Sequence, residues 1–114
     1  MSAINLAEVT PMAEYKAGKR LVAPTHPGEV VASTLDQLRV SARKAATMIG
    51  VNPMTLTNVM NGHSAVTPDM ALRLGKLFGN GPEIWLAMQA QHDLWEARQR
   101  LAGAIAAIET LEAP

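Results

Sequence analysis

The sequence predicts an all-α protein of five helices, in which the second and third form a helix-turn-helix unit and the fifth extends beyond the others. Four prolines stand just before runs with helical periodicity, where a missing N–H has no partner to lose. Residues 42–62 meet the packing constraints of a helix-turn-helix. No stretch after residue 25 shows the alternation of a β-strand. The four prolines are Pro27, Pro53, Pro68 and Pro82.

The first two helices are expected at Pro27–Leu38 and Ala42–Ile49, the second beginning after a serine cap at Ser41. The third is expected at Pro53–Met60, after the good N-cap Asn52. Inward-facing side chains of the first helix are Val30, Val31, Thr34, Leu35 and Leu38.

The last two helices are expected at Pro68–Phe78, after the cap Thr67, and from Pro82 to beyond Leu111. On the fourth helix, one stripe faces inward and consists of Ala71, Leu74 and Phe78. These helices divide the chain into an N-terminal arm (1–25), partly ordered with a possible strand near 19–22, a helix-turn-helix domain (26–96) and a C-terminal helical extension (97–114).

The composition excludes several classes of protein. The 114 residues suffice for one domain, and 48% are hydrophobic while 18% are charged, so the chain is not disordered. The absence of cysteine excludes a disulfide framework and a thiolate metal site. The longest run without polar side chains, 101–108, is far shorter than the roughly 20 residues of a membrane span. We expect a cytoplasmic protein with neither a signal peptide nor membrane contact.

The helix-turn-helix unit is defined by seven positions, counted from Ala42 as the first. Ala46 is fifth, where a small residue lets the two helices cross closely, and Gly50 is ninth, in a turn that favours positive φ. Five further positions must be buried, and they hold Ala45, Ile49, Val51, Leu56 and Val59.

The face of the third helix opposite Leu56 and Val59 is the candidate DNA-reading surface. Asn58 can pair with adenine, while Met54 and the methyl group of Thr57 can contact a thymine methyl. The competing interpretation is that these side chains are merely solvated. Candidate phosphate contacts are Ser41, Arg43, Lys44, Asn52, Thr55 and Asn61.

Charge is distributed unevenly although the formal net charge is zero. Residues 27–80 carry five basic and three acidic side chains, whereas residues 81–114 carry two basic and five acidic ones. This asymmetry favours a basic DNA-binding face and a separate surface for another partner.

Four segments together resemble the HigA antitoxins, Xre-type regulators of toxin–antitoxin pairs. They are H-P-G-E-V-V (26–31), the helix-turn-helix, V-T-P-D-M-A-L-R-L (66–74) and F-G-N-G-P-E-I-W-L-A-M-Q (78–89). The resemblance implies a five-helix lambda-repressor-like fold, a homodimer, a palindromic operator in the protein's own promoter, and a cognate HigB toxin resembling RelE, an mRNA endonuclease. The sequence departs from the family at Arg39, where glycine is common, and at Asn58, where relatives have a basic or small residue.

The fifth helix carries an apolar stripe with two expected roles. Residues 84–88 are expected in the protein's own core. The outer part has no helix left to cover it, so a partner helix or the N-terminal arm is expected there. A two-fold dimer through this helix places the recognition helices about 34 Å apart, one DNA turn. The expected dimer or partner surface consists of Trp95, Leu101, Ala104, Ile108 and Leu111.

The sequence lacks the motifs of common enzymes and metal sites. There is no H-E-x-x-H, glycine-rich phosphate loop or cysteine nucleophile, and the three histidines have no acid or metal-ligand partner at helical spacing apart from Asp93, next to His92. We therefore expect no catalytic residues, no metal and no cofactor. Two alternatives stay open: an interaction module with a degenerate helix-turn-helix, and a stand-alone Xre-type repressor without a toxin.

Overall fold

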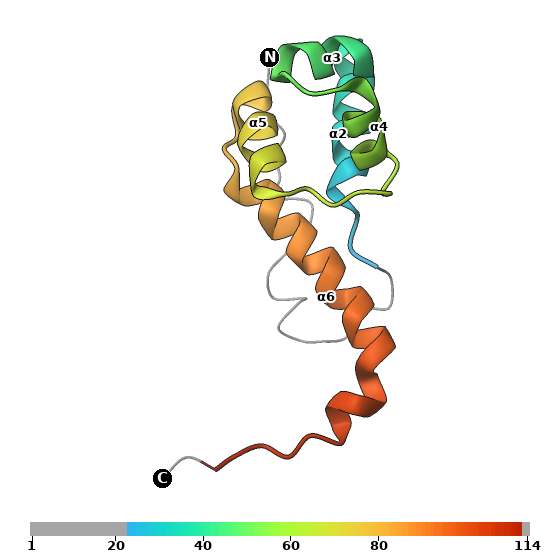
Figure 1. Ribbon diagram of the computed structural model, residues 1–114, viewed down its shortest axis with the longest axis vertical. Helices are drawn as coiled ribbons and strands as arrows, with labels where there is room; N and C mark the ends of the chain where they lie inside the picture. Colours follow the sequence, from blue (N-terminus) through green and yellow to red (C-terminus); the bar gives the residue numbers. More distant parts are fainter. Residues whose placement is uncertain (1–22, 113–114) are drawn as a thin grey trace.

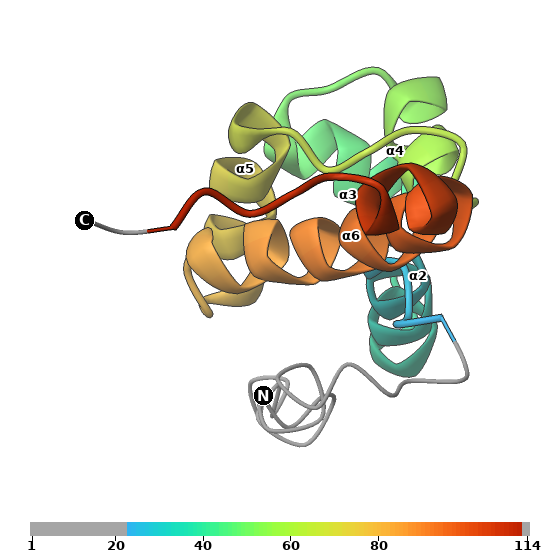
Figure 2. The ribbon, with the colours of Figure 1, turned by 90° about the horizontal axis from the view of Figure 1, so that it is seen from below.

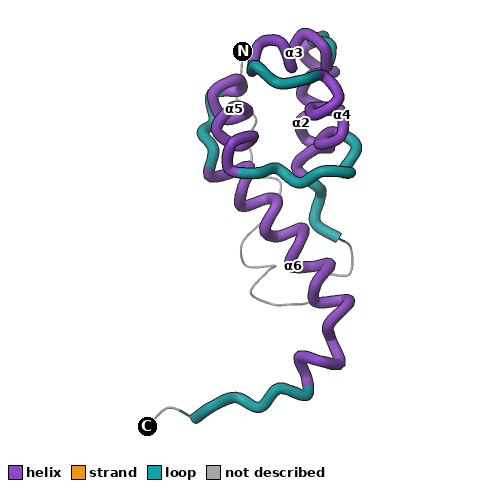
Figure 3. Tube along the Cα trace, in the orientation of Figure 1, coloured by secondary structure: helices purple, strands orange, loops and turns teal. Residues whose placement is uncertain are grey.

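The computed structural model describes residues 23–112, and within them the chain forms five α-helices and no strand (Figures 1 and 3). The first four helices have the predicted bounds, which confirms the all-α prediction. The expected N-terminal arm lies mostly outside the described residues, as does the possible strand at 19–22. The helices are α2 (Pro27–Leu38), α3 (Ala42–Ile49), α4 (Pro53–Met60), α5 (Pro68–Phe78) and α6 (Glu83–Ala106).

Side-chain caps explain why four helices begin where the sequence predicts. Ser41, Asn52 and Thr67 each accept a hydrogen bond from a backbone N–H in the first turn of α3, α4 or α5. His26 does the same for α2, because its Nδ1 accepts from the N–H of Gly28 at 2.9 Å. These bonds satisfy donors that a helix start otherwise leaves free.

The fifth helix is shorter than predicted. It begins at Glu83, with Pro82 as an N-cap lacking a side-chain hydrogen bond, and it ends at Ala106 rather than beyond Leu111. Every side chain from residue 98 to 112 is exposed, so no packing supports a longer helix. Glu109 and Glu112 also place negative charge beyond the negative end of the helix dipole.

The core is formed by α2 to α5 and by the first turns of α6. Trp85 and Leu74 are fully buried, and the Phe78 and Trp85 rings lie 5.6 Å apart. Of the five helix-turn-helix positions that must be buried, four are buried and Val51 is half-buried, and Val51 still packs against the core. Leu38, predicted to face inward, is exposed at the end of α2. The other core residues are Val31, Leu35, Ala45, Ala46, Ile49, Leu56, Val59, Val66, Met70, Ala71 and Met88.

The H-P-G sequence at the start of α2 has a packing reason. A Cβ atom on Gly28 would lie 1.7 Å from the backbone oxygen of Val59, inside the closest approach that atoms allow. Glycine therefore lets the first turn of α2 rest directly on the last turn of α4. His26 caps this turn and Pro27 occupies its first position. The motif thus fixes the position of α4 relative to the bundle.

Helix α6 divides into a packed half and a projecting half. Figure 2 views the molecule from below, with α6 crossing in front of the bundle. Its first half packs against α5 and α2, where Trp85, Met88 and Gln89 are buried. Its second half leaves the bundle, and the helix ends far from α3 and α4 (Figure 1). The expected domain boundary at residue 97 falls inside this continuous helix.

Candidate nucleic-acid interface

Helix α4 presents a polar face opposite its buried side chains. With about 100° per residue, Met54 and Asn58 lie opposite Leu56 and Val59 on the helix. Met54 is 65% exposed. Thr57 and Asn58 are half-buried, so they are less open than Met54. The exposed surface is therefore widest at the N-terminal end of α4, the end that enters the major groove in helix-turn-helix proteins.

Two of the predicted phosphate contacts, Ser41 and Asn52, are N-cap residues. The Ser41 hydroxyl accepts from the N–H of Lys44 at 3.0 Å, and Asn52 Oδ1 accepts from the N–H of Met54 at 2.8 Å. Both side chains are exposed. The serine O–H and the asparagine NH₂ group can still donate a hydrogen bond to a phosphate oxygen. Capping and phosphate binding are thus compatible in the same side chain.

The two helices of the helix-turn-helix differ from the others in the charge of their first turns. Helices α2, α5 and α6 have an acidic residue there, Glu29, Asp69 and Glu83 respectively. Helices α3 and α4 have none, and α3 instead begins with Arg43 and Lys44. An acid would compensate the positive helix end but would repel a phosphate. The ends of α3 and α4 are therefore open to an external anion.

The remaining predicted contacts surround this surface. Arg43, Lys44, Thr55 and Asn61 are all exposed. The backbone oxygen of Asn58 accepts from the N–H groups of His63 and Ser64, at 2.8 and 3.1 Å. These bonds fold the following loop back against the end of α4 and fix its last turn.

Two polar links that the sequence did not reveal hold the unit in place. On α5, the guanidinium of Arg73 donates to the backbone oxygen of Ile49, a free acceptor at the end of α3. On α6, Gln89 Oε1 accepts from the N–H of Val66 at 2.8 Å, and Gln89 is buried. Each link joins residues more than twenty positions apart in the sequence, so helical spacing could not indicate it.

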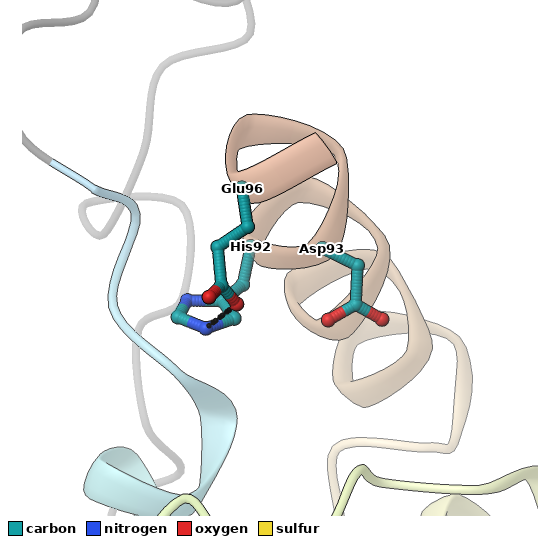
Figure 4. Close-up of side chains that lie close together, drawn as sticks. All are labelled: His92, Asp93 and Glu96. Atoms are coloured by element: carbon teal, nitrogen blue, oxygen red, sulfur yellow. Dashed lines mark ion pairs between the residues drawn. The ribbon is translucent and has the colours of Figure 1, made fainter. Parts of the chain in front are cut away.

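His92 corrects the expectation that the histidines lack an acidic partner. Its Nε2 lies 2.8 Å from Oε1 of Glu96, four residues further along α6 (Figure 4). Its Nδ1 lies 2.8 Å from the backbone oxygen of Pro24. Both ring nitrogens of His92 thus face an oxygen atom. His92 therefore joins the segment before α2 to α6.

His92 and Glu96, together with the neighbouring Asp93, are of types that bind metals, and one ligand atom from each lies within 4.8 Å of the others. In Figure 4 the Asp93 side chain lies to one side of the His92–Glu96 pair and takes no part in it. Its carboxylate accepts from Gln89 Nε2 at 2.9 Å. Protein partners thus account for all three side chains, and the cluster is a structural junction.

His26 lies next to this junction, and its ring meets that of His92 edge-on at 5.0 Å. Burial lowers the pKa of His26 below its ordinary value of 6.5, and the neighbouring His92 lowers this pKa further. The neutral ring suits the cap, because Nδ1 must accept from Gly28 and so cannot carry a proton.

The expected partner surface lies on two different parts of the chain. Trp95 is half-buried, while Leu101 and Ala104 are exposed on the projecting half of α6. Ile108 and Leu111 follow the end of the helix, so they do not continue its stripe as predicted. The exposed apolar stripe on the helix is completed by Leu94 and Ile105, which are 47% and 56% exposed. No helix of the described residues is long and apolar enough to cross a membrane.

The fold and the exposed face of α4 define a helix-turn-helix protein of the DNA-binding class. No protein-family model matches the chain. Antitoxin HigA-1 of Vibrio cholerae is 33% identical to it over 78 residues, 68% of this chain and 73% of the relative. An addiction module antidote protein of the HigA family from Coxiella burnetii is 35% identical, with a TM-score of 0.75 over 80% of this chain and 100% of that one. The chain belongs to the HigA family.

Solved relatives of this chain include complexes with operator DNA. Antitoxin GraA in complex with its operator is 33% identical to this chain, with a TM-score of 0.74 over 83% of this chain and 98% of that one.

Proposed function

We propose that this protein is an autoregulatory antitoxin, which binds a palindromic operator upstream of its own gene as a homodimer and neutralises an mRNA-endonuclease toxin of the HigB (RelE-like) type. The observation that carries the DNA-binding part is the open, acid-free N-terminal end of both α3 and α4. The likeness to GraA, solved with its operator, supports the same role.

Base recognition is assigned to the polar face of α4. Asn58 pairs with adenine through its amide, whose NH₂ group donates to N7 while its oxygen accepts from the N6 amino group, and this paired pattern discriminates sequence. Met54, the most exposed of the three, contacts a thymine methyl together with Thr57. These contacts set which sequence is bound rather than how tightly DNA in general is held.

Phosphate contacts position this face on the duplex. Arg43 and Lys44 lie in the first turn of α3, so their charges add to the positive end of that helix. Binding through them releases counterions and therefore weakens as salt is added. The other phosphate contacts are assigned to Ser41, Asn52, Thr55 and Asn61.

The homodimer is assigned to the projecting half of α6. There Leu101, Ile105 and Leu94 are exposed on one stripe of the helix, next to Ala104 and the half-buried Trp95. A second copy related by a two-fold axis would cover this stripe with the same stripe. Pairing of this kind presents two α4 helices to the two halves of a palindrome.

Toxin binding is supported by family membership and by charge. Residues 81–114 carry five acidic and two basic side chains. An enzyme that cleaves mRNA needs a basic surface for its substrate, and an acidic surface is complementary to it. A stand-alone repressor would bind DNA equally well, so co-purification with the product of the neighbouring gene distinguishes the two functions.

The test is a fluorescence-anisotropy titration against the DNA upstream of the protein's own gene, with random DNA as control. We expect tighter binding to the upstream DNA and a steep loss of affinity with salt. Asn58→Ala should lower the affinity for operator about tenfold and leave random DNA nearly unchanged.

Arg43→Ala is the matched control, because it should weaken binding to both DNAs and reduce the salt slope by about 1. Binding that shows no sequence preference, or no salt dependence, would contradict the proposal. Equal effects of both variants on both DNAs would remove Asn58 from the reading face.

A further inference from the structure

Arg39 has an unusual backbone conformation. It ends α2 with φ 57° and ψ 41°, in the left-handed region, and it is the single non-glycine residue of the described chain with positive φ. Four other turns in the described residues use glycine for positive φ, at Gly50, Gly62, Gly79 and Gly81. A side chain in this region crowds its own carbonyl, which glycine avoids. Arginine is therefore a costly choice at a position that glycine would fill without strain.

Contacts within the described residues do not repay this cost. The backbone N–H of Arg39 donates to the carbonyl of Asp36, a bond that any residue would make. The Arg39 side chain is exposed and forms no hydrogen bond or ion pair with residues 23–112. The stability of the domain thus gives no reason for the guanidinium.

The charged residues near Arg39 supply a reason for a guanidinium at this position. Arg39 precedes the N-cap Ser41 by two residues, so its Cα lies within about 7.6 Å of the start of α3. Arg43 and Lys44 stand just inside that helix, whose first turn has no acid. The guanidinium is a rigid fork that binds phosphate oxygens in pairs, and its long stem can reach past the turn.

We propose that Arg39 binds a phosphate of the operator backbone and that arginine is kept in this strained turn for its charge. The inference rests on the proposed function, since it adds a contact to the same DNA interface. A phosphate-binding role for Arg39 can be distinguished from a structural one. Removing the Arg39 side chain should weaken DNA binding while leaving the fold as stable as before, or more stable.

The experiment compares Arg39→Gly and Arg39→Lys with the wild type as full chains. Thermal unfolding gives stability, and anisotropy titrations at three salt concentrations give the affinity for upstream and random DNA. Arg39→Gly should raise Tm by about 3 °C, weaken binding to both DNAs about fivefold and reduce the salt slope by about 1. Arg39→Lys should keep most of the salt slope, because it keeps the charge.

Arg100→Ala on the projecting half of α6 is the control for removing one exposed positive charge, and it should leave the salt slope unchanged. Wild-type affinity and salt slope in Arg39→Gly would overturn the assignment, as would a fall in its Tm, which would indicate a structural role. Failure of the wild type to bind the upstream DNA would instead overturn the proposed function.

Discussion

The two halves of α6 are parts of one continuous helix, yet they have opposite surroundings. In the first half, Trp85 and Met88 are buried against α5 and α2, and Gln89 holds the loop before α5 through the N–H of Val66. In the second half every side chain from residue 98 onward is exposed, apolar ones included. Figure 1 shows the same contrast as a helix that begins in the bundle and ends outside it.

This difference separates the part of the chain that buries its apolar side chains by itself from the part that leaves them exposed. Burial of apolar surface stabilises the first half without a partner. The second half leaves Leu101 and Ile105 in water, which is unfavourable for a patch of neighbouring apolar side chains unless another surface covers it. Helix α4 belongs to the self-sufficient first region, whereas the proposed homodimer, and with it the spacing of two α4 helices, depends on the projecting half of α6.

The largest expected difference between the two halves of α6 is in the loss of stability when a large apolar side chain of each half is truncated to alanine. Trp85→Ala should lower the free energy of unfolding by about 4 kcal/mol, because it leaves a cavity in the core and an unpaired Asn80 side chain. Leu101→Ala should change monomer stability by less than about 0.5 kcal/mol.

Chemical denaturation at low protein concentration measures both values. Analytical ultracentrifugation at higher concentration should then show that Leu101→Ala weakens the dimer. A loss of several kcal/mol from Leu101→Ala in the monomer would mean that the projecting half is packed after all.

A glycine-to-alanine substitution can be made both in the packed bundle, at Gly28, and in the projecting half of α6, at Gly103. Gly28→Ala should cost about 3 kcal/mol and displace α4, because its Cβ would collide with the carbonyl of Val59. Gly103→Ala should instead stabilise α6 by about 0.8 kcal/mol, since a Cβ there meets nothing within 4 Å. Thermal unfolding distinguishes the two outcomes. Similar stabilities for the two variants would show that the α2–α4 contact is looser than described.

Acidification gives the smallest expected effect, and it acts at the junction between the halves. The pKa of His26 is lowered in the folded protein, so the unfolded chain binds the proton more readily. The stabilising contribution of neutral His26 is therefore present above pH 6.5 and is lost as the pH falls through the folded pKa. Protonation of Nδ1 would also break the cap of α2.

His26→Asn keeps an oxygen that can cap α2 but does not titrate. Its stability should fall less than that of the wild type between pH 7.5 and 5.0, measured by urea denaturation. The comparison isolates His26 from the groups that face it, namely His92, Asp93 and Glu96 on α6 and Glu29 on α2. Identical pH profiles would contradict the assigned role of His26.

The candidate site could be predicted largely because it is local. Caps, prolines and glycines act within one or two turns, so Gly50 and Asn52 mark the turn between the two helices of the helix-turn-helix without knowledge of the fold. The His92–Glu96 pair has the local spacing of one helical turn and was not predicted. The contact of His92 with Pro24 spans 68 positions, so the sequence could not indicate it. It also could not indicate that Asn58 is half-buried, which depends on how neighbouring segments pack.

By itself, the sequence determined the bounds of the first four helices, the helix-turn-helix and the identity of the side chains on α4, since these follow from periodicity and capping. Only the tertiary structure decided that Gly28 brings α2 onto Val59, that Arg39 adopts a left-handed turn and that α6 ends at Ala106. These features depend on what each segment contacts. Helix α6, for example, ends within a segment whose side chains are all exposed, where no packing supports a longer helix.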